Sequence, residues 1–327
     1  MKNYLGIDIG GTKIGFGILK NKKLTTLELP TETNKGSKQV LKNIECGIHE
    51  ILKKTFSREP SAVNRQLNAA GVGIPGIILP RKQKIVRLPN LKCLEKINTI
   101  KKITKIVKKY SPSIHFENDA NAAALGEAQF GRAKKFSSFV YLTVSTGIGG
   151  GIVIDNKIVD GIQGYAGEIG HIVLEPNGSK CGCGKRGCLE AYASGESTEK
   201  IAKRYYRKNT RDRIIQKIID GDPNNISTKT LSIAYKKGSS FAKVMFDHQT
   251  NYIAQAIDAI INIIDPEAVI IGGGVAQAGK FWFNIIRKKV KKLSKGYYRK
   301  TKILPSKLGK NTGILGAIAV AIQGENQ

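Results

Sequence analysis

The sequence predicts an α/β protein built from two similar halves, each with a mixed sheet. Apolar residues alternate in short segments broken by turns, and further along each half they recur at the three-and-four spacing of amphipathic helices. The order strand, Gly-rich turn, strand occurs at 4–29 and again at 139–159, and an offset of about 134 residues aligns Thr12 with Thr146. Because so long a period excludes a solenoid, it indicates two copies of one α/β domain.

The elements follow from these patterns in chain order. In the first half, strands are expected at 4–9, 13–19, 24–29, 69–74 and 114–117, and helices at 37–56, 99–110 and 120–130. In the second half, strands are expected at 139–144, 148–154, 157–159 and 268–271, and helices at 197–208, 211–220, 229–236, 240–264, 280–293 and 312–322. We expect a smaller domain of residues 1–118 plus about 310–327, a larger domain of residues 119–309, and a hinge near 117–135.

Composition limits the class of protein. The chain has 327 residues, 41% of them hydrophobic, and no run of eighteen apolar residues. Its first residues lack the apolar core of a signal peptide, so we expect a cytoplasmic protein without a membrane partner. Five cysteines, an odd number, argue against a disulfide framework.

The charge of the chain is strongly positive. A formal net charge of +29 would suit a nucleic-acid-binding protein. The excess is mostly lysine, however, spread along several expected helices, and no helix-turn-helix, zinc-finger helix or RNA-binding signature occurs. We therefore expect no specific nucleic-acid partner; attraction of anionic substrates would be a by-product.

Residues 168–190 carry the most specific motif of the chain. One imidazole and three thiols lie within a short Gly-rich segment, a ligand set typical of tetrahedral Zn²⁺: His171, Cys181, Cys183 and Cys188. Four protein ligands leave no open position, so the metal is expected to be structural and to fix the flanking Glu168 and Glu190. The alternative is a cysteine-rich surface loop without metal.

Two Gly-rich turns are candidates for phosphate binding. The first spans Asp8 to Lys13 and contains Gly10, Gly11 and Thr12. Its counterpart contains Thr146 and Gly147. Successive glycine amides can form a concave donor site for an anion, and two such turns suit the polyphosphate of a kinase or ATPase. An ordinary hairpin turn is the alternative, and neither turn ends in the Gly-Lys-Ser/Thr of a Walker loop.

Two further junctions follow expected strands. Gly272, Gly273 and Gly274 are predicted to open a helix and to admit an adenosine or a phosphate, although such turns are also common without a ligand. Asn118 and Asp119 lie where a strand gives way to an Ala-rich helix, at the sheet edge where α/β proteins bind ligands. Asp119 is either an N-cap or a general base for a sugar hydroxyl, which Asn118 could help to bind.

These segments together resemble the ROK family of sugar kinases and repressors, within the actin and hexokinase-like ATPases. The resemblance covers essentially the whole chain, from Asp8-Ile-Gly-Gly-Thr-Lys through Glu117-Asn-Asp-Ala-Asn to Glu168-Ile-Gly-His and Cys181-Gly-Cys-Gly-Lys-Arg-Gly-Cys-Leu-Glu. It implies two ribonuclease H-like domains with a cleft between them, a homodimer or homotetramer, and Mg²⁺ arriving with ATP.

The resemblance also implies roles for individual residues. Asp119 would be the catalytic base, and His171 would serve both zinc and sugar through its two nitrogens. The sugar would contact Gly76, Asn90, Asn118, Asp119, Glu168, His171 and Glu190. The nucleotide would contact Asp8, Gly10, Gly11, Thr12, Lys13, Thr146, Gly147, Gly273 and Gly274.

The resemblance predicts an ATP-dependent hexose kinase, most simply a glucokinase of glycolysis, because Ile169 in Gly167-Glu-Ile-Gly-His is similar to glucose-type members. An N-acetylglucosamine or N-acetylmannosamine kinase and a fructokinase are the alternative enzymes. A sugar-sensing or DNA-binding regulator is the alternative of another class. It is disfavoured because family repressors carry an N-terminal winged helix-turn-helix, whereas this sequence opens on the first strand.

Overall fold

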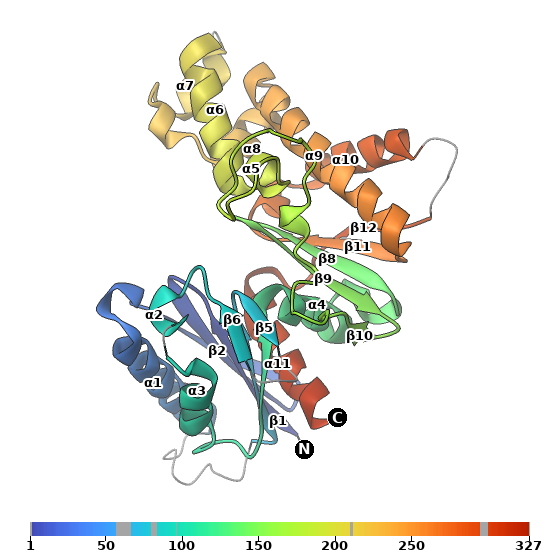
Figure 1. Cartoon of the computed structure of the whole chain (residues 1–327). Coiled ribbons are helices and arrows are strands. Elements are labelled where there is room, and N and C mark those ends of the chain that lie inside the picture. The colour runs from blue at the N-terminus through green and yellow to red at the C-terminus, as the bar shows by residue number, and fades with distance from the viewer. Residues whose placement is uncertain are drawn as a thin grey trace. The chain divides into compact units, whose positions relative to one another are not determined.

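The computed structural model describes residues 2–56, 67–79, 84–95, 97–209, 212–294 and 300–326 (Figure 1). The chain forms two compact units. The first comprises residues 1–135, 156–166 and 307–327, and the second 136–155 and 167–306. The chain therefore first passes from one unit to the other after Lys135, whereas the expected domain boundary followed Asn118. The difference arises because the helix that begins at Asp119 packs within the first unit.

The first unit is built on a five-stranded mixed sheet of order β3-β2-β1-β4-β7. The first three strands form an antiparallel meander, and β4 and β7 continue the sheet parallel to β1. Their bounds are β1 Asn3–Ile9, β2 Lys13–Lys20, β3 Lys23–Pro30, β4 Ala69–Ile74 and β7 Ile114–Asn118. The five strands expected from the alternating pattern are thus confirmed.

Helices cover both faces of this sheet, as the period of two along β1 requires. Leu5, Ile7 and Ile9 pack into a core with helices α1, Ser37–Phe56, and α3, Thr99–Val107. On the opposite face, Tyr4 and Gly6 contact α11, Thr312–Glu325, which also packs on α4, Asp119–Phe130. The unit also contains a small hairpin and a short helix: β5 Ile77–Leu79, β6 Lys84–Arg87 and α2 Lys92–Glu95.

The second sheet repeats the topology of the first, with the order β10-β9-β8-β11-β12. Again an antiparallel pair is extended by parallel strands, β8 pairing with β9 on one side and with β11 on the other. The bounds are β8 Phe139–Val144, β9 Ile148–Ile154, β10 Lys157–Ile158, β11 Ala268–Gly272 and β12 Lys302–Pro305. This repetition confirms the duplication predicted from the spacing of the two meanders.

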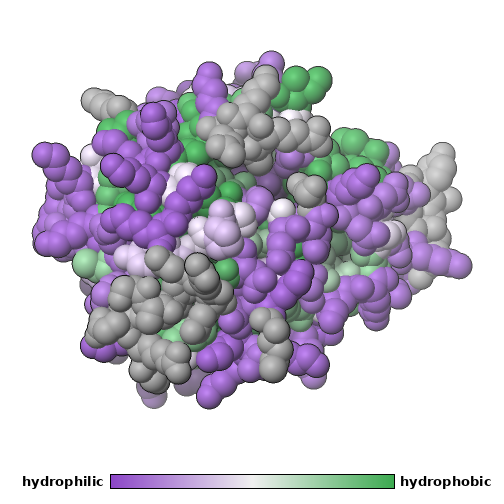
Figure 2. Space-filling model, turned by 90° about the horizontal axis from the view of Figure 1, so that it is seen from below, coloured by the Kyte–Doolittle hydropathy of each residue, from purple (hydrophilic) through white to green (hydrophobic). Residues whose placement is uncertain are grey.

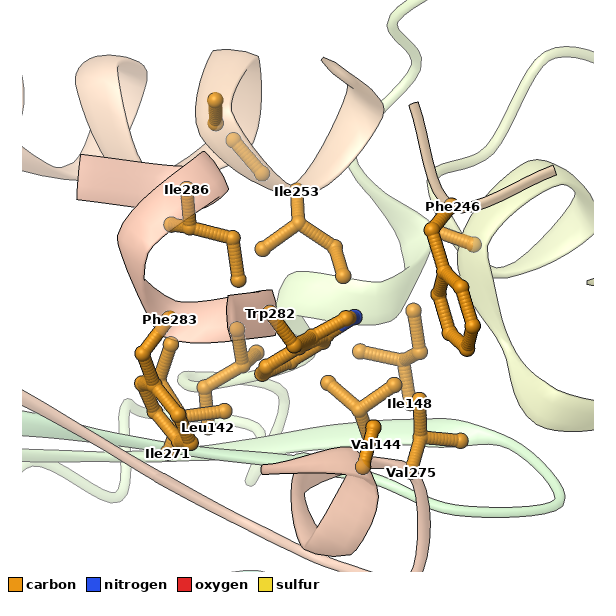
Figure 3. Packing of buried hydrophobic residues seen from close by; sticks show 14 of the residues in the cluster. Leu142, Val144, Ile148, Phe246, Ile253, Ile271, Val275, Trp282, Phe283 and Ile286 are labelled. Atoms are coloured by element: carbon orange, nitrogen blue, oxygen red, sulfur yellow. The ribbon is translucent and has the colours of Figure 1, made fainter. Parts of the chain in front are cut away.

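Helices of the second unit pack around one buried tryptophan. Trp282 lies among apolar side chains of β8, α9 and α10, and its indole N–H donates to Gln249 Oε1 at 2.9 Å (Figure 3). The helices are α5 Glu190–Ala193, α6 Gly195–Asn209, α7 Arg213–Ile218, α8 Thr228–Lys236, α9 Ser240–Ile264 and α10 Lys280–Leu293. Arg211, the expected start of α7, lies outside the described residues.

Hydrophilic residues predominate on the face drawn in Figure 2. Within the part of the chain that the structure describes, no helix is at once long and apolar enough to span a bilayer.

Candidate functional site

The first Gly-rich turn joins β1 to β2. The turn is closed by a hydrogen bond from Gly10 N to Lys13 O at 2.9 Å, and Thr31 Oγ1 donates to Gly10 O at 2.7 Å. A β-carbon added at Gly11 would lie 3.2 Å from Asn90 O, so the loop that contains Asn90 lies directly against the turn. The structure thus brings one expected sugar-binding residue next to the expected phosphate-binding turn, within one unit.

Lys13 has a partner within the sheet. Its ammonium group lies 2.6 Å from Glu28 Oε1, and both side chains are largely exposed. An exposed ion pair contributes little to stability and is readily broken, so Lys13 can leave Glu28 for a more strongly charged phosphate. In the structure, however, the expected phosphate ligand points toward a carboxylate of its own sheet.

Asp8 precedes the first turn and lies near a second carboxylate. It keeps a partly exposed surface but is closely surrounded by protein atoms; a β-carbon at Gly313 of α11 would lie 1.9 Å from its Oδ2. Burial, together with the neighbouring charge of Asp119, raises the pKa of Asp8 to about 7, and Lys13 opposes the shift. Asp8 and Asp119 therefore interact electrostatically within the first unit.

Asp119 is exposed at the first turn of α4, and its neighbour performs the capping. Asn118 is the N-cap residue, because its side-chain oxygen accepts from Ala120 N at 2.8 Å and from Asn121 N at 3.1 Å. The N-cap alternative for Asp119 is therefore wrong. Sequence alone could not decide between two adjacent residues that are both good caps.

The side chain of Asn118 makes most of its hydrogen bonds within the protein. Besides capping α4, it donates from Nδ2 to Gly76 O at 2.9 Å. Two expected sugar-binding residues are thus linked to each other. Of the four hydrogen bonds that an asparagine side chain can make, one N–H remains for a ligand.

Glu117 belongs to the motif but had no expected role. Its carboxylate stabilises the junction between β7 and α4. Its Oε1 accepts from Asn118 N at 2.8 Å and from Asn121 Nδ2 at 3.1 Å. Burial raises the pKa of Glu117 to about 7, and the nearby charge of Asp160 raises it too. A carboxylate in place of an apolar residue at the end of a buried strand was the signal that could have identified it.

The four expected metal ligands meet at one point of the second unit. The ligand atoms of His171, Cys181, Cys183 and Cys188 all lie within 4.8 Å of one another. Cys183 Sγ is 3.7 Å from Cys188 Sγ, and Cys181 Sγ is 3.7 Å from His171 Nδ1. Zinc bonds of about 2.3 Å to sulfur and 2.1 Å to nitrogen in a tetrahedron require separations of roughly 3.6–3.8 Å. The side chains therefore fit a closed zinc site.

A compact turn shapes the candidate metal-binding loop, residues 171–188. Gly184 N donates to Cys181 O at 3.0 Å and Cys181 N to Lys185 O at 2.8 Å, which turns the chain around Cys183. Tyr192, stacked on Tyr252, accepts at its hydroxyl from Ser179 N at 2.6 Å and so ties the start of the loop to α5. These bonds hold the loop against the helices behind it.

Both expected carboxylates lie beside the metal ligands. Glu168 Oε2 is 3.7 Å from His171 Nε2, so the two nitrogens of this imidazole face a carboxylate on one side and thiols on the other. Glu190 Oε1 is 3.8 Å from Cys181 Sγ, while its Oε2 accepts from Ile148 N at 2.9 Å. Glu190 therefore connects the metal-binding loop to the second Gly-rich turn.

That second turn lies against the triple glycine. Ser145 N donates to Gly147 O at 2.9 Å to close the turn, in which Thr146 is exposed. A β-carbon at Gly147 would lie 2.6 Å from Glu190 Oε2, and one at Gly273 would lie 2.3 Å from Val144 O. The expected adenosine and phosphate segments of this unit, including Gly274, are thus neighbours.

One expectation about the triple glycine is wrong. It is followed by a four-residue 3₁₀ helix, Val275–Ala278, and not by an α-helix. Gly279, at φ 118°, ends that turn, and α10 begins at Lys280. Four residues do not build the aligned amides of an α-helix N-terminus, so the helix-dipole argument for a phosphate at this point is lost.

Asp8→Asn is expected to make the stability of the protein depend less on pH. Because its folded pKa is raised, Asp8 binds a proton in the folded state that the unfolded chain releases above about pH 4. The free energy of unfolding therefore falls between about pH 4 and 7. We expect the variant to match wild type near pH 4 and to exceed it by roughly 1–3 kcal/mol at pH 8.

Thermal unfolding between pH 4 and 8 measures this difference. Asp155→Asn, at an exposed turn, is the matched control and should follow wild type. Melting curves for Asp8→Asn and wild type that stay parallel over the whole pH range would refute the assignment of the raised pKa to Asp8.

The two sheets have equivalent strand orders, and each has a Gly-rich turn between its first two strands. This arrangement defines an actin-like ATPase fold. A model described as "ROK family" matches residues 4–324. The chain belongs to the ROK family.

Relatives and solved structures agree with this assignment. The chain is 33% identical to the glucokinase of Thermotoga maritima over 97% of the chain and 96% of that protein. It is 30% identical to the N-acetylmannosamine kinase of Haemophilus influenzae over 96% of the chain and 93% of that protein. The crystal structure of a ROK family glucokinase from Streptomyces griseus in complex with glucose and AMPPNP matches with a TM-score of 0.83 and 29% identity, over 98% of this chain and 100% of that one.

Proposed function

We propose that the protein is an ATP-dependent hexose kinase with Asp119 as its general base. The observation that carries this proposal is the placement of Asp119, an exposed carboxylate at the start of α4 that interacts with Asp8 at the base of the first Gly-rich turn. A base beside a phosphate-binding turn is what transfer of a phosphoryl group to a hydroxyl requires. Relatives named as sugar kinases along nearly the whole chain support it.

In this mechanism Asp119 accepts the proton of the attacking sugar hydroxyl. The hydroxyl becomes acidic only late in the transfer, so the orientation of the Asp119 carboxylate matters more than a raised pKa of that carboxylate. Two neighbours orient Asp119. Glu117 accepts a hydrogen bond from Asn118 N, and Asn118 caps the helix on which Asp119 lies. Asn118, Gly76 and Asn90 are assigned to the sugar as well.

The remaining sugar contacts are assigned to the residues beside the candidate metal site. Glu168, His171 and Glu190 accept from or donate to sugar hydroxyls, and charge-assisted bonds of this kind read the stereochemistry of a polyol. Zinc, held by His171 and the three cysteines, would fix these carboxylates without taking part in the chemistry.

The nucleotide is assigned to the Gly-rich segments. Phosphate oxygens accept from the amides and hydroxyls of the two turns, with Lys13 as the cation of the first and Gly273 and Gly274 beside the adenosine. Mg²⁺ would enter with ATP and neutralise charge on its phosphates. The residues assigned to phosphate are Asp8, Gly10, Gly11, Thr12, Lys13, Thr146 and Gly147.

Glucose is the proposed sugar. Ile169 of the Glu168-Ile-Gly-His171 motif is buried behind the carboxylates, where a β-carbon at Gly150 would lie 2.4 Å from its Cδ1. The glucokinase relatives support glucose, whereas the N-acetylmannosamine kinase relative keeps an N-acetylhexosamine as the second candidate. An N-acetyl group needs room that a hydroxyl does not, so turnover of different sugars separates them.

ADP release measured across glucose, mannose, fructose, N-acetylglucosamine and N-acetylmannosamine tests this choice. We expect kcat/KM to be highest for glucose, by at least about tenfold over the N-acetylhexosamines, since each lost or clashing contact costs 1–3 kcal/mol. A higher kcat/KM for an N-acetylhexosamine would reassign the substrate. No turnover of any sugar by zinc-loaded protein would reject the kinase.

A regulator remains the alternative of another class, because the family contains repressors and the chain carries a formal charge of +29. Tight, sequence-specific binding of a DNA duplex at physiological salt, without sugar turnover, would favour it. We propose the enzyme, acting in the cytoplasm as a homodimer or homotetramer and binding DNA only weakly, with a steep dependence on salt.

A further inference from the structure

We propose that Glu127 is a positioning residue: its carboxylate holds together the first and the last places where the chain passes between the two compact units. These passages follow Lys135 and Ser306. The inference rests on the proposed kinase function. Glu127 belongs to none of the expected sugar, nucleotide or metal ligands.

The carboxylate contacts one backbone amide on each side. Glu127 is 0% exposed, its Oε2 accepts from Arg132 N at 2.7 Å, and its Oε1 accepts from Lys307 N at 3.1 Å. A β-carbon at Gly131 would lie 2.0 Å from Oε2, so the chain leaving α4 runs directly against the carboxylate. Segments about 175 residues apart in sequence (307 − 132 = 175) thus share one buried side chain.

Helix α4 connects this contact to the expected base. Asp119 lies in its first turn and Glu127 in its last, about 12 Å apart at 1.5 Å per residue. Because a helix of this length moves as a rigid element, a shift of the passage at Arg132 is transmitted to Asp119.

The passage after Ser306 is also connected to α4. After Lys307 the chain enters α11, which packs closely on α4: a β-carbon at Gly126 would lie 3.0 Å from Gly316 Cα (Figure 1). At the start of α11, Gly313 lies against Asp8. The first segment held by Glu127 thus follows α4, which begins at Asp119, and the second leads into α11, whose first turn lies against Asp8.

Only a carboxylate satisfies both amides. Each of its oxygens accepts one N–H, whereas a glutamine at this position has one accepting oxygen and turns its NH₂ group toward the other amide. A buried amide left without its partner costs free energy and loosens its segment. Glu127→Gln should therefore release one passage from the other while it keeps the size of the side chain.

The test combines kinetics with hydrogen exchange on the full-length, zinc-loaded protein. In wild type, the amides of Arg132 and Lys307 are expected to exchange slowly, although both side chains are exposed. In Glu127→Gln, exchange should rise in both segments, 131–136 and 306–309. At a temperature where the variant is folded, kcat should fall at least about tenfold while the KM values for sugar and ATP stay within about threefold.

Asp212→Asn is the matched control for lost stability. Asp212 also accepts several bonds from backbone amides and hydroxyls, but it joins α7 to the start of α9 inside the second unit. Its loss should lower Tm without changing kcat or the exchange of the two passages.

The outcomes separate the positioning role from the kinase proposal. Wild type that phosphorylates no sugar rejects the kinase, while the exchange measurement still decides whether Glu127 holds both segments. Fast exchange of either amide in wild type, or an unchanged kcat in folded Glu127→Gln, would overturn the positioning role even in an active kinase.

Discussion

Replacing Asp119 by asparagine is expected to lower kcat by about 10²–10⁴-fold while sugar affinity stays near wild type. The amide keeps the size of the side chain and its place in the first turn of α4, because Asn118 and not Asp119 caps this helix. It cannot accept the proton of the sugar hydroxyl. The loss should therefore appear in the chemical step, as measured by a coupled ADP-release assay for kcat and by calorimetry for sugar binding.

The control for this substitution is Asp155→Asn, which removes a carboxylate from an exposed turn and should leave both values unchanged. One secondary effect is expected. Since the charge of Asp119 raises the pKa of Asp8, its removal should let Asp8 ionise at lower pH. Turnover of Asp119→Asn within a few-fold of wild type would remove Asp119 from the mechanism.

Removal of the metal is expected to give the second largest effect. Loss of zinc should lower kcat/KM for the sugar by about 10- to 100-fold, because Glu168 and Glu190 lose the anchored ligands beside them. Since Glu190 also holds Ile148 N, the effect should reach the second Gly-rich turn and raise the KM for ATP as well. Elemental analysis before and after chelation, with kinetics on the same samples, measures both.

Cysteine substitutions provide the matched comparison. Cys181→Ser and Cys188→Ser should abolish the content of about one zinc per chain, whereas Cys46→Ser and Cys93→Ser, at cysteines outside the cluster, should leave it intact. Activity should return when zinc is restored to chelated wild type. Full activity in protein shown to be free of zinc would refute the anchoring role of the metal.

Elements with a long, regular apolar pattern could be predicted from the sequence. The bounds of α1, α9 and α10 are those expected, because twenty, twenty-five and fourteen residues offer several turns of one apolar face. The sequence pattern does not predict the strands β5, β6 and β12 or the four-residue helices α2 and α5, because elements of three or four residues are too short to show a hydrophobic period. Helix α3 ends at Val107 instead of Tyr110, where its buried face stops.

The candidate site was predictable where its residues are close in sequence. The expected zinc ligands span eighteen residues (188 − 171 + 1 = 18), and the structure brings their candidate ligand atoms together. The contacts of Glu127 with Arg132 and Lys307 could not be predicted, because both are made to backbone amides, which carry no residue-type signal. The placement of α4 in the first unit depends in the same way on its packing against α11, at the other end of the chain.

The central claim is that Asp119 accepts a proton from a hexose bound by the carboxylates beside the zinc. A crystal structure of the zinc-loaded protein with glucose and AMPPNP tests it most directly. The account predicts Asp119 within about 2.6–3.2 Å of the sugar's 6-hydroxyl, with Glu168 and Glu190 bonded to other hydroxyls of the same sugar. Glucose bound with Asp119 remote from every hydroxyl, or with neither glutamate in contact, would contradict it.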